Sequence, residues 1–387
     1  MPCGRGHFGG VEVGTMKRAA RISRNVLAIL LAWACAVPAV AAPAAAGGKA
    51  GVRASRRSKG HAASRFRGVP TFADSTSEDI AAYDDPVIRQ AAVEALGRYN
   101  GTVVAVDPNT GRILSIVNQK LAFSNGTIPC STIKPTIAVA ALEEDVITRD
   151  TMLKVGRRKY MNLTEAMAHS NNQFFEELGR RMGFATVSRY AKLLGLGELS
   201  GYNMPEEHPG LLPAIAPAHG GVARMSSFGE GIQMTPLQLA SLASAVANGG
   251  TLYYLQYPRT EEERANFAPR VKRQLDIAPL LPPIREGMLA AVLYGTGKAS
   301  FDQGGDELAL GKTGTCNDQK SRVGWFVSYA DEARPKIALV VLLRGSSHRV
   351  MGPTAAVVAG RIYRKLREQN YFAEVPHRNE WIGASGN

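Results

Sequence analysis

Strand-like segments lie at both ends of the folded part of this chain, and a long helix-rich segment separates them. Two apolar runs, 102–106 and 112–117, flank the turn-forming sequence Asp107-Pro-Asn-Thr-Gly111 and predict a β-hairpin. Three further strands are predicted near the C-terminus, over residues 308–315, 323–329 and 336–343. Between the two groups, residues from about 131 to 247 have helical spacing.

This order predicts an α+β fold. One antiparallel sheet, built from the N- and C-terminal strands and flanked by helices, would carry an inserted, mainly helical subdomain. Helices are expected after Asp85-Pro86, ending near Gly97, and over residues 352–366. We expect a site between the sheet edge and the inserted helices, because substrate clefts commonly form in such places.

The positive charge of the chain is concentrated near its N-terminus. The formal net charge is +13, but residues 1–75 carry twelve Lys or Arg and only two acidic residues, Glu12 and Asp74. The remainder is therefore close to neutral. A basic face for nucleic acid is not expected on the folded part, so we predict no nucleic-acid partner.

The N-terminal segment has the pattern of a secretory signal. A positive stretch, 16–24, precedes an uncharged apolar stretch, 26–37, and a small-residue cleavage site at 39–41. We predict a signal or anchor over 1–41, a flexible basic linker over 42–75 and a catalytic domain over 76–387. A cleaved signal is favoured over a retained membrane anchor through residues 26–46. Either one places the domain in the periplasm or on the outer face of the cytoplasmic membrane.

The first chemically suggestive motif is Ser131-Thr-Ile-Lys134, which follows Pro129-Cys130. On a helix, residues three apart share a face, so Lys134 lies beside Ser131. A serine hydroxyl needs a base to become a nucleophile, and a buried lysine kept neutral by desolvation can be that base. The spacing S-x-x-K is common on protein surfaces, so this pair alone does not establish a site.

The second motif, Ser170-Asn171-Asn172, interrupts a helix-like segment, because such residues are poor in a helix interior. An ordinary turn or cap explains it as well as function does. The functional interpretation gives Ser170 a proton-relay role and lets Asn172 bind a substrate amide.

The third motif, Lys312-Thr313-Gly314-Thr315, lies in the first C-terminal strand. A glycine inside a strand costs stability and often marks the close approach of a ligand. A lysine and a hydroxyl beside it suit a carboxylate. The alternative is an edge strand that the lysine protects from pairing.

Together the three motifs form the ordered signature S-x-x-K, S-x-N, K-T-G of penicillin-binding proteins and class A β-lactamases. The sequence resembles the penicillin-binding transpeptidase domain, of the serine acyltransferase and β-lactamase-like superfamily, over roughly residues 100–365. Further segments resemble the family at 101–114, 194–198, 209–213, 227–231, 234–239 and 247–250.

The resemblance implies an enzyme of peptidoglycan (cell wall) biosynthesis, a serine-type D-Ala-D-Ala transpeptidase or carboxypeptidase that binds penicillin covalently. Ser131 would attack the D-Ala-D-Ala carbonyl, or a β-lactam, and form an acyl-enzyme. Lys134 would take its proton. Ser170, supported by Lys312, would pass a proton to the leaving group, and Asn172 would orient the acyl side chain.

The resemblance also implies a carboxylate site at Thr313, Gly314 and Thr315. Backbone N–H groups of Ser131 and Thr315 would form an oxyanion hole. The expected partners are peptidoglycan stem peptides and β-lactam antibiotics. No metal or organic cofactor is implied, because the seven histidines form no H-E-x-x-H or C-x-x-C pattern with their neighbours.

The fate of the acyl group stays open. An amine acceptor gives a transpeptidase, water gives a D,D-carboxypeptidase, and fast deacylation of a drug gives a β-lactamase; we rank them in that order. A hypothesis of another class is a non-catalytic peptidoglycan-binding or β-lactam-sensing domain. No glycosyltransferase region fits before residue 76, so we expect only a signal, a tether and a catalytic domain.

Two cysteines, Cys130 and Cys316, adjoin the residues that the resemblance assigns to the oxyanion hole. Since the N–H groups of Ser131 and Thr315 would point at one oxygen, the neighbouring Cα atoms can approach the roughly 5–6 Å that a disulfide requires. An oxidising compartment permits that bond. We hypothesise a Cys130–Cys316 disulfide; the alternative is two small, buried free thiols.

Overall fold

The computed structural model describes residues 68–301, 309–318, 321–330 and 335–372, all within the compact unit Arg65–Asn387. The predicted signal or anchor over 1–41 and most of the predicted linker lie outside the described residues, as does Leu308 of the predicted strand. Within the described part of the chain, no helix is both long and apolar enough to cross a bilayer.

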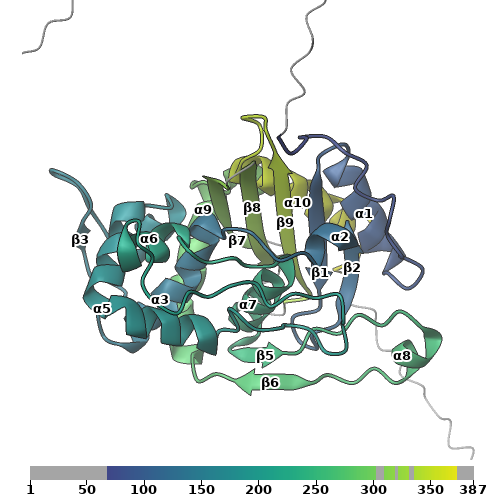
Figure 1. Ribbon diagram of the computed structural model, residues 1–387, viewed down its shortest axis with the longest axis horizontal. Coiled ribbons are helices and arrows are strands. Elements are labelled where there is room, and N and C mark those ends of the chain that lie inside the picture. Colours follow the sequence, from purple (N-terminus) through teal and green to yellow (C-terminus); the bar gives the residue numbers. More distant parts are fainter. Residues whose placement is uncertain (1–67, 302–308, 319–320, 331–334, 373–387) are drawn as a thin grey trace, which may run out of the picture. The chain divides into compact units, whose positions relative to one another are not determined.

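The centre of the fold is a five-stranded antiparallel sheet with the order β2-β1-β9-β8-β7 (Figure 1). Its strands are β1 (Gly101–Val106), β2 (Ile113–Val117), β7 (Ala309–Asn317), β8 (Arg322–Ala330) and β9 (Ile337–Gly345). The N-terminal hairpin joins the C-terminal strands through β1 and β9, with Val104 opposite Val340. The predicted sheet, assembled from both ends of the chain, is confirmed.

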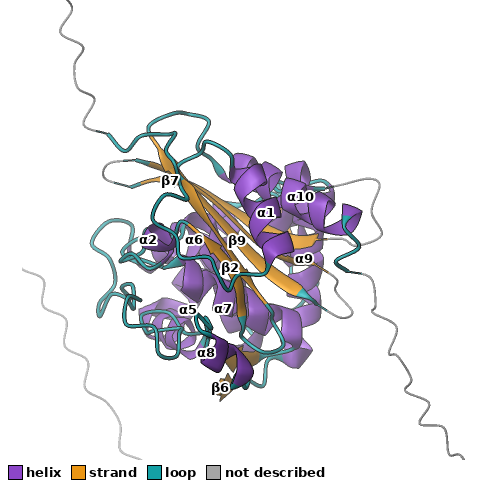
Figure 2. Ribbon diagram, turned by 90° about the vertical axis from the view of Figure 1, so that its right-hand side faces the viewer, coloured by secondary structure: helices purple, strands orange, loops and turns teal. Residues whose placement is uncertain are grey.

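One face of the sheet is covered by α1 (Pro86–Leu96) and α10 (Gly352–Glu368) (Figure 2). Asp85 caps α1, because its carboxylate accepts from the N–H groups of Val87 and Ile88, both at 3.0 Å. The apolar residues of this layer are buried together, among them Ile88, Leu96, Val103, Leu339, Val341, Val358 and Ile362.

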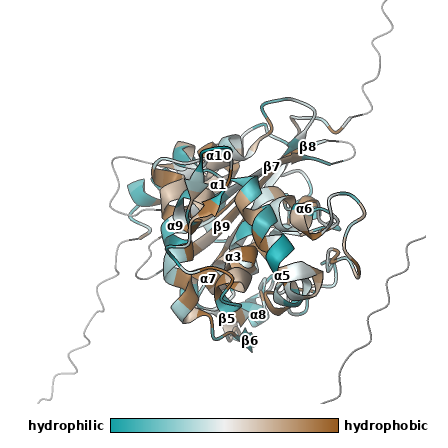
Figure 3. Cartoon of the chain, turned by 90° about the vertical axis from the view of Figure 1, so that its left-hand side faces the viewer, coloured by the Kyte–Doolittle hydropathy of each residue, from teal (hydrophilic) through white to brown (hydrophobic). Residues whose placement is uncertain are grey.

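The other face carries the predicted helical subdomain, which faces the viewer in Figure 3. Its helices are α3 (Lys134–Glu143), α4 (Leu163–Ala168), α5 (Asn172–Leu193), α6 (Gly221–Phe228), α7 (Pro236–Asn248) and α9 (Leu281–Leu293). Residues 134–141 of α3 are buried on every side, so the helix runs through the core. The second apolar cluster joins these helices to sheet residues such as Val104, Trp325, Val340 and Leu342.

The middle of the chain is less uniformly helical than its spacing suggests. Two small antiparallel two-stranded sheets are formed by β3 (Leu153–Lys154) with β4 (Tyr160–Met161), and by β5 (Thr251–Tyr253) with β6 (Val271–Gln274). Residues 195–217 form no helix, because this stretch is rich in Gly and Pro. The short elements are α2 (Gln119–Ala122), α8 (Glu261–Ala265) and the 3-10 turns η1 (Cys130–Ile133), η2 (Ala278–Leu280) and η3 (Lys298–Ser300).

The folded domain begins before residue 76, where the sequence analysis placed its boundary. Thr71 is buried, and its hydroxyl accepts from Ser347 N at 3.0 Å. Ser75 is also buried and donates from its hydroxyl to Tyr99 O at 3.0 Å. These residues satisfy backbone groups at the end of the sheet, so the last part of the predicted linker belongs to the domain.

Candidate active site

Ser131 lies in a 3-10 turn at the entrance to α3, not on the α-helix itself. The reason is Pro135, whose nitrogen has no hydrogen to donate to Ser131 O; the N–H of Lys134 makes that bond instead, one residue earlier. Ser131 is 8% exposed. Its hydroxyl makes no hydrogen bond within the described residues, so it remains available to a ligand.

Lys134 is fully buried, and its ammonium group points at the turn between α4 and α5. Its Nζ donates to Ser170 O at 2.6 Å, to Asn172 Oδ1 at 2.7 Å and to Ser170 Oγ at 3.1 Å. Burial first, and the nearby charge of Lys312 second, hold the pKa of Lys134 well below its ordinary value, while Glu176 opposes the shift. A deprotonated amine at this position can act as a base.

The turn that receives Lys134 is formed by the Ser-Asn-Asn motif. Ser170 has a φ of +52°, a left-handed conformation that ends the run of α4. Asn171 then caps α5, because its side-chain oxygen accepts from Phe174 N at 2.9 Å. The poor helix propensity noted in the sequence therefore corresponds to a break between two helices, at which Ser170 and Asn172 face Lys134.

Lys312 reaches the same serine from β7. Its Nζ donates to Ser170 Oγ at 2.8 Å and to Thr313 O at 3.0 Å. The side chain is fully buried, and this burial lowers the pKa of Lys312 to about 7. Ser170 Oγ is thus in contact with two amines of lowered pKa, which is an arrangement able to move a proton between them.

The rest of the third motif lies at the edge of the sheet, where β7 has no neighbouring strand on its outer side among the described residues. The hydroxyls of Thr313 and Thr296 are 2.6 Å apart. Thr315 is exposed, and its hydroxyl accepts from Gly352 N at 2.7 Å. These two threonines therefore already have protein partners that orient them.

Gly314 is needed for packing against the turn that carries Ser131. A Cβ at this position would lie 3.0 Å from Pro129 O, and 3.2 Å from both Cys130 Cβ and Thr132 Cγ2. From its position inside a strand, this glycine was expected to mark the approach of a ligand. In the structure it is the protein's own turn that approaches the strand.

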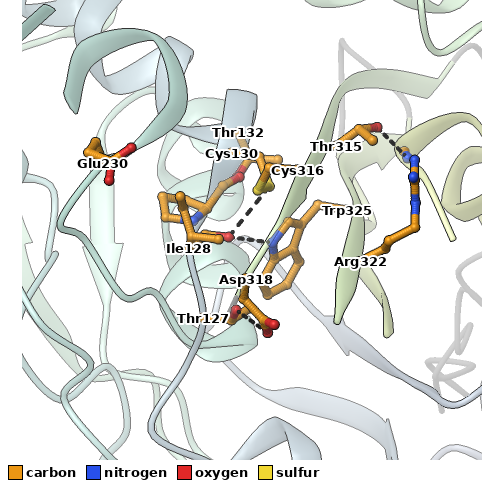
Figure 4. The surroundings of a disulfide bond; sticks show 12 residues. Thr127, Ile128, Cys130, Thr132, Glu230, Thr315, Cys316, Asp318, Arg322 and Trp325 are labelled. Carbon is orange, nitrogen blue, oxygen red and sulfur yellow. Dashed lines mark hydrogen bonds between the residues drawn. A yellow bond between two sulfur atoms is a disulfide. The ribbon is translucent and has the colours of Figure 1, made fainter. Parts of the chain in front are cut away.

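A disulfide bond joins Cys130 to Cys316 across this contact, with 5.7 Å between the Cα atoms (Figure 4). Cys130 has a φ of +53°, which aims its side chain toward β7. Next to it, Trp325 Nε1 donates to Ile128 O at 3.0 Å. Covalent and hydrogen-bonded links thus fix the Ser131 turn to two adjacent strands of the sheet.

Comparison with known proteins identifies this architecture. Residues 101–366 match the family described as the penicillin binding protein transpeptidase domain. The chain belongs to that family. Its transpeptidase domain contains all three motifs in the positions described above.

Named relatives of this penicillin-binding transpeptidase domain are distant. The chain is 27% identical to stage V sporulation protein D of Bacillus subtilis, over 67% of this chain and 48% of that protein. It is 24% identical to the peptidoglycan D,D-transpeptidase FtsI of Escherichia coli, over 73% of this chain and 54% of that protein. The chain thus spans about half the length of these relatives.

Solved structures share the fold. The penicillin-binding protein PBP2 of Pseudomonas aeruginosa has a TM-score of 0.63 and 20% identity, covering 76% of this chain and 75% of that one. The transpeptidase domain of penicillin-binding protein 3 from Burkholderia pseudomallei has a TM-score of 0.61 and 20% identity. The match covers 73% of this chain and 92% of that one. The predicted family and fold class are confirmed.

Within this transpeptidase domain, Thr296 is a site residue that the sequence analysis missed. It lies after α9 in the sequence Gly295-Thr-Gly297, and its N–H donates to Ala168 O at 3.0 Å. Its hydroxyl contacts Thr313 (2.6 Å), so Thr296 links the segment before Ser170 to the lysine-bearing strand. The sequence Gly295-Thr-Gly297 could have indicated this residue, because glycines on both sides of a polar residue often allow the backbone to approach another segment closely.

Proposed function

We propose that this domain is a peptidoglycan D,D-transpeptidase that forms an acyl-serine intermediate at Ser131 on stem peptides ending in D-Ala-D-Ala. The observation that carries the proposal is the pair of contacts made by Ser170 Oγ, to Lys134 at 3.1 Å and to Lys312 at 2.8 Å. Two buried amines of lowered pKa, both in contact with one hydroxyl, can accept and donate the protons that are transferred during acylation and deacylation.

In the proposed acylation, Ser131 Oγ attacks the carbonyl of the penultimate D-Ala while Lys134, in its neutral form, takes the hydroxyl proton. The C–N bond of the terminal D-Ala then breaks. Its nitrogen receives a proton through Ser170, whose hydroxyl is resupplied by Lys134 or Lys312. Backbone N–H groups of Ser131 and Thr315 would stabilise the oxyanion, a contribution of about 3 kcal/mol per donor.

The substrate would be held at both ends of the reacting bond. Lys312, Thr313 and Thr315, with Gly314 between the threonines, would bind the terminal carboxylate, and Asn172 would orient the acyl side chain. The exposed position of Thr315 supports this assignment. The contacts of Thr313 with Thr296, and of Thr315 with Gly352, support it as well, because fixed hydroxyls lose less freedom on binding.

In the proposed second half-reaction, an amine of another stem peptide attacks the ester carbonyl. Lys134, neutral again, takes a proton from the attacking amine; the new amide forms, the bond to Ser131 Oγ breaks, and Lys134 passes that proton to the oxygen. Water in place of the amine gives D,D-carboxypeptidase activity. A β-lactam would acylate Ser131 by opening its ring; rapid hydrolysis of that ester gives a β-lactamase. A non-catalytic domain that binds peptidoglycan or senses β-lactams is the alternative of another class.

We also propose that the domain works outside the cytoplasm, in the periplasm or on the outer face of the cytoplasmic membrane. The pattern of residues 1–41, a secretory signal or a retained anchor, supports this location. A disulfide at the site supports it too, since such bonds persist in oxidising compartments.

The experiment is to incubate the full chain with a D-Ala-D-Ala pentapeptide, with and without an added amine, and to follow the products by mass spectrometry. The proposal predicts D-Ala release and an amide product with the amine, and neither with Ser131→Ala. Hydrolysed tetrapeptide as the sole product would favour the carboxypeptidase. Absence of D-Ala release, together with absence of covalent labelling by a fluorescent penicillin, would favour the non-catalytic alternative.

A further inference from the structure

A basic tip, defined as residues 154–159, connects the strands β3 and β4 and carries four cations in the sequence Lys-Val-Gly-Arg-Arg-Lys. Figure 1 shows this part of the chain extending beyond the helices of the subdomain, beside the label β3. Residues 76–387 contain 34 Lys or Arg and 31 Asp or Glu, which leaves a net charge of +3. The four positive charges of the tip therefore exceed the net charge of the whole region to which it belongs.

The tip has a fixed base. Leu153 and Val155 are only 4% and 5% exposed, and they alternate with the exposed Lys154, as expected for a strand with one buried face. Lys154 lies opposite Tyr160 across the two strands, and Val155 N donates to Lys159 O at 2.8 Å. The cations are therefore carried into solvent by an ordered turn.

No acidic side chain neutralises the tip. Its cations are exposed, and within the described residues their side chains make no hydrogen bond or ion pair: Lys154, Arg157, Arg158 and Lys159. Two nearby acids, Glu176 and Glu177 of α5, are already bound by Arg180, at 3.0 Å and 3.4 Å. Arg181 binds Glu177 as well, at 2.9 Å. These two acids and two arginines cancel one another, so the charge of the tip stays uncompensated.

The four cations do not converge on one small ligand. Lys154 and Arg157 line a cavity of about 420 Å³, whereas Arg158 and Lys159 do not. A docked protein is not favoured either, because a specific interface usually takes about 20–30 residues from each partner and the tip has far fewer. Positive charge spread around a projecting turn suits an extended anionic surface.

Two large apolar side chains flank this charge. Met152 and Tyr160 lie on either side of the tip, and each is 56% exposed. Tyrosine is enriched at membrane–water interfaces, because its ring is apolar and its hydroxyl is polar. Lysine and arginine can likewise place their stems along an apolar layer and keep their charges in water. This combination favours a bilayer over a soluble polyanion, which has no apolar layer.

We propose that the basic tip binds the surface of a membrane that contains anionic phospholipids, with Met152 and Tyr160 at the level of the head groups. The proposed location on the outer face of the cytoplasmic membrane provides such a surface, and acyl transfer at Ser131 is no part of the argument. Each Lys or Arg close to an anionic membrane strengthens binding about fivefold. A contact of this kind orients the domain on the bilayer.

The test measures sedimentation of the full chain with phosphatidylcholine vesicles, with and without phosphatidylglycerol. Because residues 1–75 also carry twelve Lys or Arg, two variants of equal charge are compared. One replaces all four cations of the tip by Gln. The control replaces by Gln four scattered, exposed cations that form no ion pair within the described residues: Arg98, Lys192, Lys298 and Arg361.

The tip variant should bind the anionic vesicles at least about tenfold more weakly than wild type, and the control variant should lose far less. Hydrogen exchange of the peptide 152–161 gives a local measurement. Its amides should exchange more slowly with anionic vesicles and at an unchanged rate with neutral ones. Equal losses of binding in the two variants, or unchanged exchange in this peptide, overturn the inference.

Soluble polyphosphate distinguishes a membrane from a free polyanion. Met152→Ser/Tyr160→Ser should weaken binding to anionic vesicles by about threefold or more, because it removes apolar surface at the tip. If polyphosphate slows exchange in the peptide 152–161 as strongly as vesicles do, and this variant binds vesicles like wild type, the inference is overturned in favour of a free polyanion. All variants should still be acylated by benzylpenicillin, which shows that they fold. Absence of acylation in wild type would overturn the proposed function and leave the membrane contact standing.

Discussion

Lys312 Nζ donates to Ser170 Oγ at 2.8 Å, and this bond connects the edge of the sheet to the turn between α4 and α5. Lys134 reaches the same hydroxyl from α3. Strand β7, which carries Lys312, comes from the C-terminal part of the chain, whereas α3 and the turn between α4 and α5 come from its middle. The cluster therefore forms only when the helical subdomain packs against the sheet.

The proposed role of Lys134 requires its neutral form. Below the lowered pKa the amine is protonated and cannot accept the Ser131 proton, so acylation by benzylpenicillin should slow as pH falls through that pKa. Stopped-flow measurement of the acylation rate across pH gives the profile. Lys134→Ala should lower the rate by about 10²- to 10⁴-fold. A rate independent of pH, or an unimpaired Lys134→Ala, contradicts the role.

Burial of Lys312 should make stability depend on pH. Its pKa is about 7 in the folded state against an ordinary 10.5, so between these values the unfolded chain holds a proton that the folded chain lacks. Stability should therefore rise with pH from 7 to 10, by up to about 1.4 kcal/mol per unit from this group. Urea unfolding at pH 7.5 and 9 measures it.

Lys312→Met is the control for that dependence, because it removes the titrating group and keeps much of the side-chain volume. The difference in unfolding free energy between the two pH values should shrink in this variant. An identical difference in wild type and Lys312→Met would show that the pH dependence arises elsewhere.

The Cys130–Cys316 disulfide closes a loop with a sequence separation of 186 residues. Its removal in the Cys130→Ala/Cys316→Ala double variant should lower the unfolding free energy by about 2–4 kcal/mol, since the unfolded chain is no longer cross-linked. Denaturant unfolding with and without reductant measures it: reductant should destabilise wild type and leave the double variant unchanged. Equal sensitivity of both proteins to reductant would argue against a structural bond.

Thr296 is predicted to position Thr313 for the substrate carboxylate. Thr296→Val removes the hydroxyl contact and should lower kcat/KM for D-Ala-D-Ala donors by about tenfold, whereas Thr296→Ser should retain most of the activity. A donor with a C-terminal amide in place of the carboxylate should lose this sensitivity. If Thr296→Val slows both donors equally, the residue supports the fold and not carboxylate binding.

The sheet and the three motifs were predictable from the sequence, because strand runs that flank a helical segment favour one antiparallel sheet built from both ends. The disulfide could also be inferred from the sequence, because Cys130 and Cys316 adjoin Ser131 and Thr315, whose N–H groups were expected to point at one oxygen. The structure adds why Gly314 is required: the Ser131 turn packs against it.

Other features depend on contacts that no local pattern reveals. The 3-10 turn at Ser131 results from the missing N–H of Pro135. The contact of Thr296 with Thr313 joins residues 17 positions apart in the sequence. The domain boundary was placed too late, because Thr71 and Ser75 have polar, linker-like composition and become buried only against the sheet end. The two-residue strands β3 and β4 are too short for a periodic signal.

The most direct measurement is to treat the full chain with benzylpenicillin and locate the adduct by peptide mass spectrometry. The account predicts one penicillin per chain, attached to the peptide that contains Ser131, and no adduct on Ser131→Ala. An adduct on another residue, or undiminished labelling of Ser131→Ala, would contradict the assignment of Ser131 as the nucleophile.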